Sequence, residues 1–291
     1  MTPAPIEQRR TVSPPWGSDY AICLSRRGGA EAAAACAIID TIGDSSRIKT
    51  VGVVSLFERK LDAILRTRAN DDLPALGRRV REAMLRVDDA ILRIGPRPDH
   101  KVFGFCAAVG LVRGQALQVF WLGDCRAYVV RAAAGGVPAV ECLTRDHNDL
   151  NDILQRNGEY EFLKSEMPEL SRKLTWYWGS PDRPGLESLL AAQERIVALP
   201  PGDAVLFLTD GVYLPILRSL MELAHFRLDG RAYYLEDWMG RFLHKRGCVQ
   251  AGGGLDLARA HRELVAASRE STARHRRYRD SIAVASLQAP A

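Results

Sequence analysis

Short runs of apolar residues, bounded by glycine, proline or acidic residues, recur along most of this chain. One of them, Ala204 to Leu208, follows Pro200-Pro201-Gly202-Asp203 and leads through Thr209 into Asp210-Gly211. A run this short, without a helical period, predicts a buried strand. The same reasoning predicts strands over 19–24, 32–39, 105–112, 117–122, 126–130, 139–143, 194–199 and 282–287.

Turn residues between these runs predict how the strands pair. The Arg26-Arg27-Gly28-Gly29 turn predicts a hairpin of 19–24 with 32–39, which places Asp19 and Asp40 at the same end. Glycine turns predict an antiparallel meander over 105–143, and the Pro-Pro-Gly turn predicts pairing of 194–199 with 204–208.

Apolar residues at helical spacing predict helices in the rest of the chain. Two helices are expected around 54–64 and 72–94, with Asp72 as the cap of the second, and a short one over 148–160. Residues 212–279 are expected to be mainly helical, and the proline-rich residues 1–17 to be a flexible tail. Strands and helices do not alternate as βαβ units, so the order favours an α+β fold, a β-sandwich with helices, over a parallel sheet.

Five aspartates share one placement, because each lies at the edge of an apolar strand-like run. Converging carboxylates repel one another unless a cation lies between them, and aspartates with water suit Mg²⁺ or Mn²⁺ better than zinc. The alternative at each position is an ordinary turn, as Asp210-Gly211 illustrates. The five are Asp19, Asp40, Asp124, Asp210 and Asp280.

Composition narrows the class of protein. The formal charge of +5 comes from 40 basic and 35 acidic residues that are mixed along most of the chain, which does not favour nucleic-acid binding. The one dense basic run is 274–279, which a solvated helix face or a phosphate-binding role would explain. The six cysteines form no C-x-x-C pair and no zinc spacing, so we expect reduced, mostly buried thiols in a cytoplasmic protein.

Several of these segments resemble the motifs of one enzyme family and follow its order along the chain. Residues 122–128 (LGDCRAY) with 143–147 (LTRDH) resemble the "GDSRAY…LTRDH" signature of the type 2C, metal-dependent serine/threonine protein phosphatases. Residues 199–203 (LPPGD) and 208–211 (LTDG) are similar to that family's "L.pGD.lLLcSDG" element. Residues 280–284 (DSIAV) look like its "DNITVV". Each match is short, but together they cover about residues 19 to 287.

The resemblance implies a central antiparallel β-sandwich flanked by helices on both sides, forming one domain over residues 18–288. It implies two Mn²⁺ or Mg²⁺ ions held by Asp40, Asp210 and Asp280, which would be the catalytic residues. The carbonyl of Thr41 would be a further ligand, Asp19 matches the aspartate of the family's N-terminal motif, and Asp124 matches an acid that can hold a third, weaker metal.

Two of the chain's departures from the family bear directly on metal and phosphate binding. Thr41 stands where the family has glycine, so a positive φ there would cost about 1 kcal/mol or more. The family's phosphate-binding arginine before the first aspartate is missing. Guanidinium groups suit phosphate, and the run before Asp280 is tethered close to a presumed ligand, so we expect Arg277 and Arg279 to bind phosphate, with Arg9-Arg10 of the tail as the alternative.

The resemblance predicts an enzyme, a metal-dependent hydrolase that removes phosphate from phosphoserine and phosphothreonine with a metal-activated water. The alternative is a catalytically weakened pseudophosphatase that acts as a phosphoprotein- or kinase-binding module in signalling. The expected partners are a phosphoprotein substrate and a cognate serine/threonine kinase, with no nucleic acid and no membrane. The expected state is a monomer.

Overall fold

A computed structural model describes most of the 291 residues. The described ranges are 7–13, 19–26, 33–42, 47–67, 71–94, 103–131, 133, 135–163, 165–180, 185–221, 225–275 and 281–289. Within these ranges no helix is both long and apolar enough to cross a bilayer.

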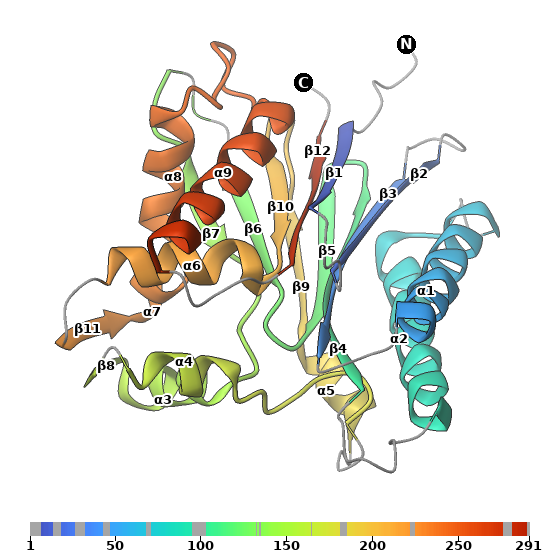
Figure 1. The fold of residues 1–291 in the computed structure, drawn as a ribbon. Helices are drawn as coiled ribbons and strands as arrows, with labels where there is room; N and C mark the ends of the chain where they lie inside the picture. The colour runs from blue at the N-terminus through green and yellow to red at the C-terminus, as the bar shows by residue number, and fades with distance from the viewer. Residues whose placement is uncertain are drawn as a thin grey trace.

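Two five-stranded antiparallel sheets form the centre of the molecule (Figure 1). The first has the order β1-β12-β10-β6-β7, with strands Glu7–Ser13, Ile282–Gln288, Ala204–Leu208, Arg126–Arg131 and Ala139–Cys142. The second has the order β2-β3-β4-β5-β9, with strands Tyr20–Arg26, Ala33–Ile42, Gly104–Arg113, Ala116–Leu122 and Glu194–Ala198. A separate antiparallel pair joins β8 (Glu159–Leu163) to β11 (His225–Asp229).

Helices cover the outer faces of both sheets (Figure 1). The second sheet is covered by α1 (Arg47–Thr67) and α2 (Leu73–Ile94), and α5 (Leu186–Ala192) packs against α2. The first sheet is covered by α6 (Asp210–Leu220), α8 (Glu236–Lys245) and α9 (Leu257–His275), while α3 (Asp149–Asn157), α4 (Met167–Arg172) and α7 (Gly230–Tyr233) complete that half.

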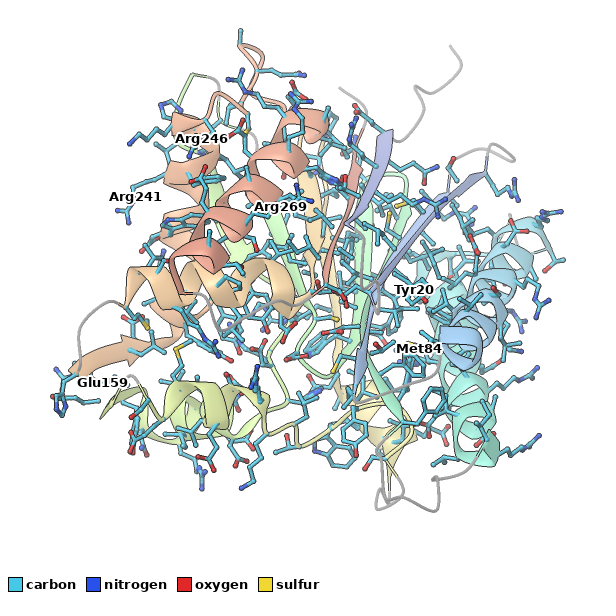
Figure 2. All side chains as sticks on the ribbon, viewed as in Figure 1. Tyr20, Met84, Glu159, Arg241, Arg246 and Arg269 are labelled. Carbon is cyan, nitrogen blue, oxygen red and sulfur yellow. The ribbon has the colours of Figure 1, made fainter. Side chains whose placement is uncertain are left out.

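Side-chain alternation explains the layers. Along β10, Leu206 and Leu208 face the helices, whereas Val205 and Phe207 face the opposite sheet. Successive side chains of a strand point to opposite faces, so continuously apolar strands can be buried on both. On α2 the apolar residues recur at helical spacing, and Met84 lies between the helix and its sheet (Figure 2).

The inter-sheet core requires glycine at one position. Phe207 of the first sheet lies against Gly110 of β4, where an added Cβ would be 2.3 Å from the ring's Cζ. A side chain at residue 110 would therefore have to displace a buried aromatic ring. The absence of that side chain lets the two sheets approach each other at this point.

The antiparallel sandwich flanked by helices confirms the expected fold class, and the 19–24 hairpin and the two long helices are also confirmed. The predicted pairing of 194–199 with 204–208 is wrong, because β9 pairs with β5 and β10 pairs with β6 and β12. The predicted meander is wrong for the same reason: β4-β5 and β6-β7 are hairpins of different sheets. The chain crosses from the second sheet to the first between β5 and β6, returns between β7 and β9, and crosses again between β9 and β10.

Residues 7–13 correct the expected tail. They form β1, which pairs with β12 over the whole strand, from Glu7 opposite Gln288 to Ser13 opposite Ile282. The alternating apolar pattern of a half-buried strand is weak here, so backbone hydrogen bonds to β12 fix this edge strand. The expected helical stretch 212–279 is likewise interrupted by strand β11.

Candidate metal centre

The hairpin of β2 and β3 brings Asp19 and Asp40 together, as predicted. Tyr20 pairs with Ile39, so the next positions along the two strands are Asp19 and Asp40. Asp19 is buried, whereas Asp40 is half-buried. On its other side, Asp40 lies opposite Cys106 of β4, so β4 also has a residue at this end of the sheet.

Asp124 reaches this end through a tight turn after β5. Gly123 has φ +90°, and an added Cβ would be 2.2 Å from the Cys106 Sγ, so only glycine fits between β5 and β4. The Asp124 side chain is hydrogen-bonded to Cys106. Burial, and then the negative charge of Asp146, raise the pKa of Asp124 to about 7, although the Cys106 hydrogen bond lowers it.

Asp210 comes from the opposite sheet. Thr209, directly after β10, makes two hydrogen bonds to Ala283 of β12: its backbone N donates to the Ala283 carbonyl at 3.3 Å, and its Oγ1 accepts from the Ala283 N at 3.2 Å. Asp210 follows as the first residue of α6. One turn later, the Tyr213 hydroxyl donates to the Asp124 carbonyl at 2.9 Å, which ties α6 to the turn after β5.

The buried thiol of Cys125 lies within the electrostatic reach of four of the five predicted aspartates. Its pKa is raised well above the ordinary value, first by burial and then by the negative charges of Asp40, Asp124, Asp19 and Asp210. Carboxylates from both sheets therefore act on one sulfur atom, at the end of the sandwich where the sequence predicted a metal. A raised pKa keeps this thiol protonated, which agrees with the expectation that Cys125 is not a nucleophile.

A buried arginine supports this end of the first sheet. Arg126 and Asp146 are both 0% exposed and form a bidentate ion pair, with Nε–Oδ1 at 3.0 Å and Nη2–Oδ2 at 2.8 Å. The guanidinium carbon lies 3.6 Å from the ring centroid of Tyr213 and 4.4 Å from that of Tyr233. The Tyr233 hydroxyl donates to Asp146 at 2.5 Å. This network orders the residues that follow Asp124.

His147 holds the Gly123 turn, a role that the sequence did not indicate. The Gly123 backbone N donates to His147 Nδ1 at 3.0 Å, and the His147 N donates to the Gly123 carbonyl at 3.0 Å. His147 is itself buried. The signal for this role in the sequence is the position of His147 at the end of the LTRDH segment, 24 residues after Gly123.

The structure removes one expected difficulty at Thr41. This residue belongs to β3 and pairs with Phe105, so its backbone is that of an extended strand. Among the described residues other than glycine, Leu235 alone has a positive φ, of 58°. The strain that a glycine-like conformation would impose on Thr41 is therefore absent.

Other predicted site residues lie outside the described residues, namely Asp280, Arg277 and Arg279. Their neighbour Ser281 is described, and β12 begins directly after it at Ile282. Among the residues that the structure describes, no three histidine, cysteine, aspartate or glutamate side chains form a group that could hold a metal ion. The complete ligand set and the phosphate-binding arginines stay predictions.

No protein-family model and no curated protein sequence matches the chain. Solved structures do match it along nearly their whole length. The S. agalactiae serine/threonine phosphatase has a TM-score of 0.66 at 15% identity, covering 97% of this chain and 99% of that chain. The serine/threonine phosphatase Stp1 from Staphylococcus aureus has a TM-score of 0.66 at 13% identity, covering 98% and 96%.

A third similar structure is the catalytic domain of the serine/threonine protein phosphatase PstP in complex with two manganese ions. Its TM-score is 0.60 at 14% identity, covering 99% of each chain. At these identities the likeness concerns the fold. The chain has a type 2C phosphatase-like fold, as the motifs in its sequence implied.

Proposed function

We propose that this protein is a metal-dependent phosphatase that removes phosphate from phosphoserine and phosphothreonine residues of proteins. The observation that carries the proposal is the placement of Asp19, Asp40, Asp124 and Asp210 at one end of the sandwich, where the negative charge of each acts on the buried Cys125 thiol. The local hairpin of β2 and β3 joins Asp19 to Asp40, whereas Asp124, after β5, and Asp210, after β10 of the other sheet, are brought to this end by the tertiary fold. The likeness to serine/threonine phosphatases supports the same reaction.

The chemistry of this donor set fits Mn²⁺ or Mg²⁺. The acids contribute oxygen atoms only, and hard divalent cations prefer carboxylate and carbonyl oxygens with water in the remaining positions. Asp40, Asp210 and Asp280 would hold two ions together with the Thr41 carbonyl, and Asp19 and Asp124 would complete the site. When bound, such ions supply Lewis acidity, which lowers the pKa of water and neutralises phosphoryl oxygens.

The described residues contribute rigidity to this site. Gly123, His147 and Tyr213 fix the backbone around Asp124 through the contacts given above. Thr209 fixes the start of α6 to β12, directly before Asp210. Ligands that are held in place by such contacts do not have to be ordered when the cations bind. Arg277 and Arg279 are the proposed partners of the phosphate group.

The test measures hydrolysis of para-nitrophenyl phosphate with and without Mn²⁺, and Mn²⁺ binding by calorimetry. We expect Asp40→Asn and Asp210→Asn each to abolish Mn²⁺-dependent hydrolysis and to weaken Mn²⁺ binding. Asp89→Asn, which makes the same change at an exposed acid on α2, is the matched control and should alter neither.

Two outcomes would contradict this assignment. Unchanged Mn²⁺ affinity in both variants would refute the metal site itself. Normal Mn²⁺ binding by the wild-type protein without any turnover would instead favour the pseudophosphatase, which binds phosphoproteins without hydrolysing them.

A further inference from the structure

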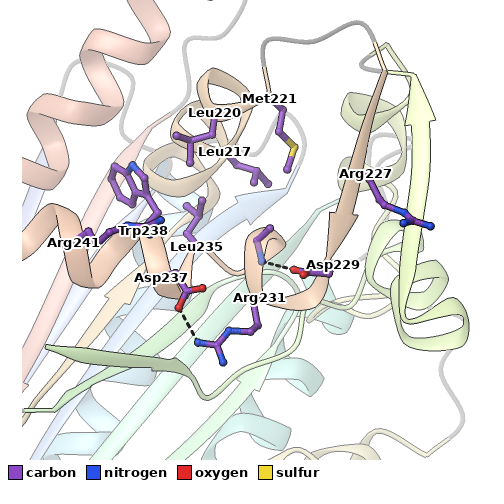
Figure 3. Close-up of a pocket in the computed structure, with 11 residues that line it drawn as sticks. Leu217, Leu220, Met221, Arg227, Asp229, Arg231, Leu235, Asp237, Trp238 and Arg241 are labelled. Carbon is purple, nitrogen blue, oxygen red and sulfur yellow. Dashed lines mark hydrogen bonds and ion pairs between the residues drawn. The ribbon is translucent and has the colours of Figure 1, made fainter. Parts of the chain in front are cut away.

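Two adjoining hollows lie on the surface beyond the far end of α6. The larger, of about 490 Å³, is formed by residues of α6, β11, α7 and α8 (Figure 3). The smaller, of about 360 Å³, is formed by residues of α3, α7 and the segment before α3. Asp229 and Arg231 line both hollows, and the two hollows together are termed the groove.

The larger hollow has an apolar floor. Leu217 and Leu220 of α6 gather there with Leu235 and Trp238 (Figure 3). Leu220 is 52% exposed, although leucine is favoured in the interior. Trp238 is half-buried and stacks on Phe242 with ring centroids 4.6 Å apart, which holds its indole in place beside the hollow. This floor suits an apolar side chain of a partner.

The acids that line the groove already have partners. Asp229 accepts a hydrogen bond from the Ala232 N at 2.8 Å and caps α7. Asp237 pairs with Arg231 at 2.7 Å. Glu236 accepts from the Cys142 N at 2.9 Å.

Two guanidinium groups of the groove lack such acidic partners. Arg241 of α8, which lines the larger hollow, projects from the outer side of its helix (Figure 2) and pairs with no acid among the residues that the structure describes. Arg145, in the smaller hollow, lies over the Tyr234 ring at 4.6 Å. Among the described residues, its hydrogen bonds go only to the carbonyls of Cys142 and Thr144. Each hollow thus offers one positive charge to a ligand.

The groove is connected to the proposed metal centre by one helix. Asp210 begins α6, and Leu217 and Leu220 lie in its last turns, so the 11-residue helix joins the two sites. At a rise of roughly 1.5 Å per residue, Leu220 is about 15 Å from Asp210. Figure 1 shows α6 leading from the end of β10 outward toward β11.

We propose that this groove is a docking site for an acidic segment of the phosphoprotein substrate, with one apolar anchor side chain seated on Leu220 and Trp238. Carboxylates flanking the anchor would pair with Arg241 and Arg145. A two-part groove with a charge in each hollow fits an extended chain with acids on both sides of its anchor. This inference rests on the proposed phosphatase function, because docking of the acidic segment assists the protein only if the attached phosphorylated residue is hydrolysed at the metal centre.

The distance sets the spacing in the substrate. An extended chain spans at most about 3.3–3.6 Å per residue, so at least about five residues must separate the phosphorylated residue from the anchor. Docking at that distance acts on substrate binding and leaves the chemical step unchanged. It should therefore lower KM and leave kcat as it is.

The test uses synthetic phosphothreonine peptides. One has a short neutral core only, and two others have the sequence Asp-Leu-Asp-Trp-Asp attached through a glycine-serine spacer, at the N-terminal or C-terminal side of the core. We expect one of the two attached peptides to have a KM about tenfold below that of the core peptide, with unchanged kcat. Replacing its aspartates with lysines should remove the advantage.

Variants locate the effect. Arg241→Glu and Leu220→Asp should abolish the KM advantage and leave hydrolysis of para-nitrophenyl phosphate unchanged, because that small substrate cannot reach the groove. Arg262→Glu, the same charge change at an exposed position of α9 outside both hollows, should keep the advantage. An equal KM for all three peptides, or an undiminished advantage in Arg241→Glu, would overturn the docking site.

A binding measurement separates this proposal from the proposed function. Fluorescence anisotropy of a labelled, unphosphorylated Asp-Leu-Asp-Trp-Asp peptide reports the groove without any catalysis. Binding that is lost in Arg241→Glu and kept in Arg262→Glu supports the groove even if para-nitrophenyl phosphate is not hydrolysed. No binding to the wild-type protein, together with normal hydrolysis, would overturn the groove and leave the phosphatase standing.

Discussion

The buried pair of Arg126 and Asp146 allows a sharp test of what holds this end of the sandwich together. We consider Asp146→Asn, which keeps the shape of the side chain and removes its charge. Arg126 would remain at 0% exposure, with its hydrogen bonds to the Tyr233 carbonyl at 2.9 Å and the Tyr128 hydroxyl at 3.3 Å, but without a carboxylate.

The magnitude follows from burial. Burial alone would lower the pKa of Arg126, but the negative charge of Asp146 raises it above the ordinary value, so the guanidinium stays charged in the core. Removing one partner of a fully buried ion pair typically costs about 3–5 kcal/mol, because the remaining charge is left uncompensated. The free energy of unfolding should fall by an amount in that range.

The control is an ion pair of nearly the same length at the surface. Arg231 and Asp237 are 2.7 Å apart, against 2.8 Å for Arg126 and Asp146, but they are 68% and 61% exposed. Water already screens that pair, so Asp237→Asn should leave the unfolding free energy unchanged within error. The comparison isolates burial as the cause of the difference.

Urea denaturation at pH 7, followed by tryptophan fluorescence, measures both variants. The midpoint for Asp146→Asn should fall well below that of the wild-type protein and of Asp237→Asn, with a similar slope. If Asp146→Asn were as stable as Asp237→Asn, the aromatic rings around Arg126 would be sufficient to hold its charge. The reasoning from the buried ion pair would then be wrong.

Two further predictions concern stability. Gly110→Ala should destabilise the protein by about 1–3 kcal/mol, because its Cβ would be 2.3 Å from Phe207. Gly52→Ala, at an open position in α1, should instead stabilise it by roughly 0.5–1 kcal/mol. Equal effects of the two substitutions in urea denaturation would contradict the packing argument. Burial, and then the charge of Arg9, lower the pKa of His261 to about 4 from its ordinary 6.5, so the folded state favours the neutral ring. Its contribution is complete above about pH 6.5 and is lost as the pH falls toward 4, by up to about 3 kcal/mol. His261→Gln should be less sensitive than the wild-type protein over that window, and identical pH profiles would refute the role of His261.

The local sequence pattern was sufficient to predict an element where residues close in sequence are also close in space. The hairpin of β2 and β3 could be predicted because a short turn joins its strands, and this placed Asp19 beside Asp40. The helix α2 could be predicted because its apolar residues recur at helical spacing, and Asp72 caps it as expected, with its Oδ1 accepting from the Ala75 N at 2.8 Å. The positions of the acids at strand ends were likewise visible in the sequence.

Pairings between distant segments were decided by the tertiary structure. The turn at Pro200-Pro201-Gly202 predicted a hairpin, but β9 and β10 belong to different sheets, because each strand pairs where its faces are best buried and not with its sequence neighbour. β1 escaped prediction because a charged edge strand is held by the backbone of β12, which lies at the other end of the chain.

The same division holds for the candidate site. The sequence by itself determined the residue types, oxygen-bearing acids that follow apolar strands, and the family whose motifs they resemble. The packing of one sheet on the other decided that Asp40, Asp124 and Asp210 act on a single buried thiol, because these residues lie on three different strands and segments far apart along the chain. It also decided that Arg126, one of 40 basic residues in the sequence, is buried against an aspartate and a cluster of tyrosines, since burial depends on contacts that no local pattern encodes.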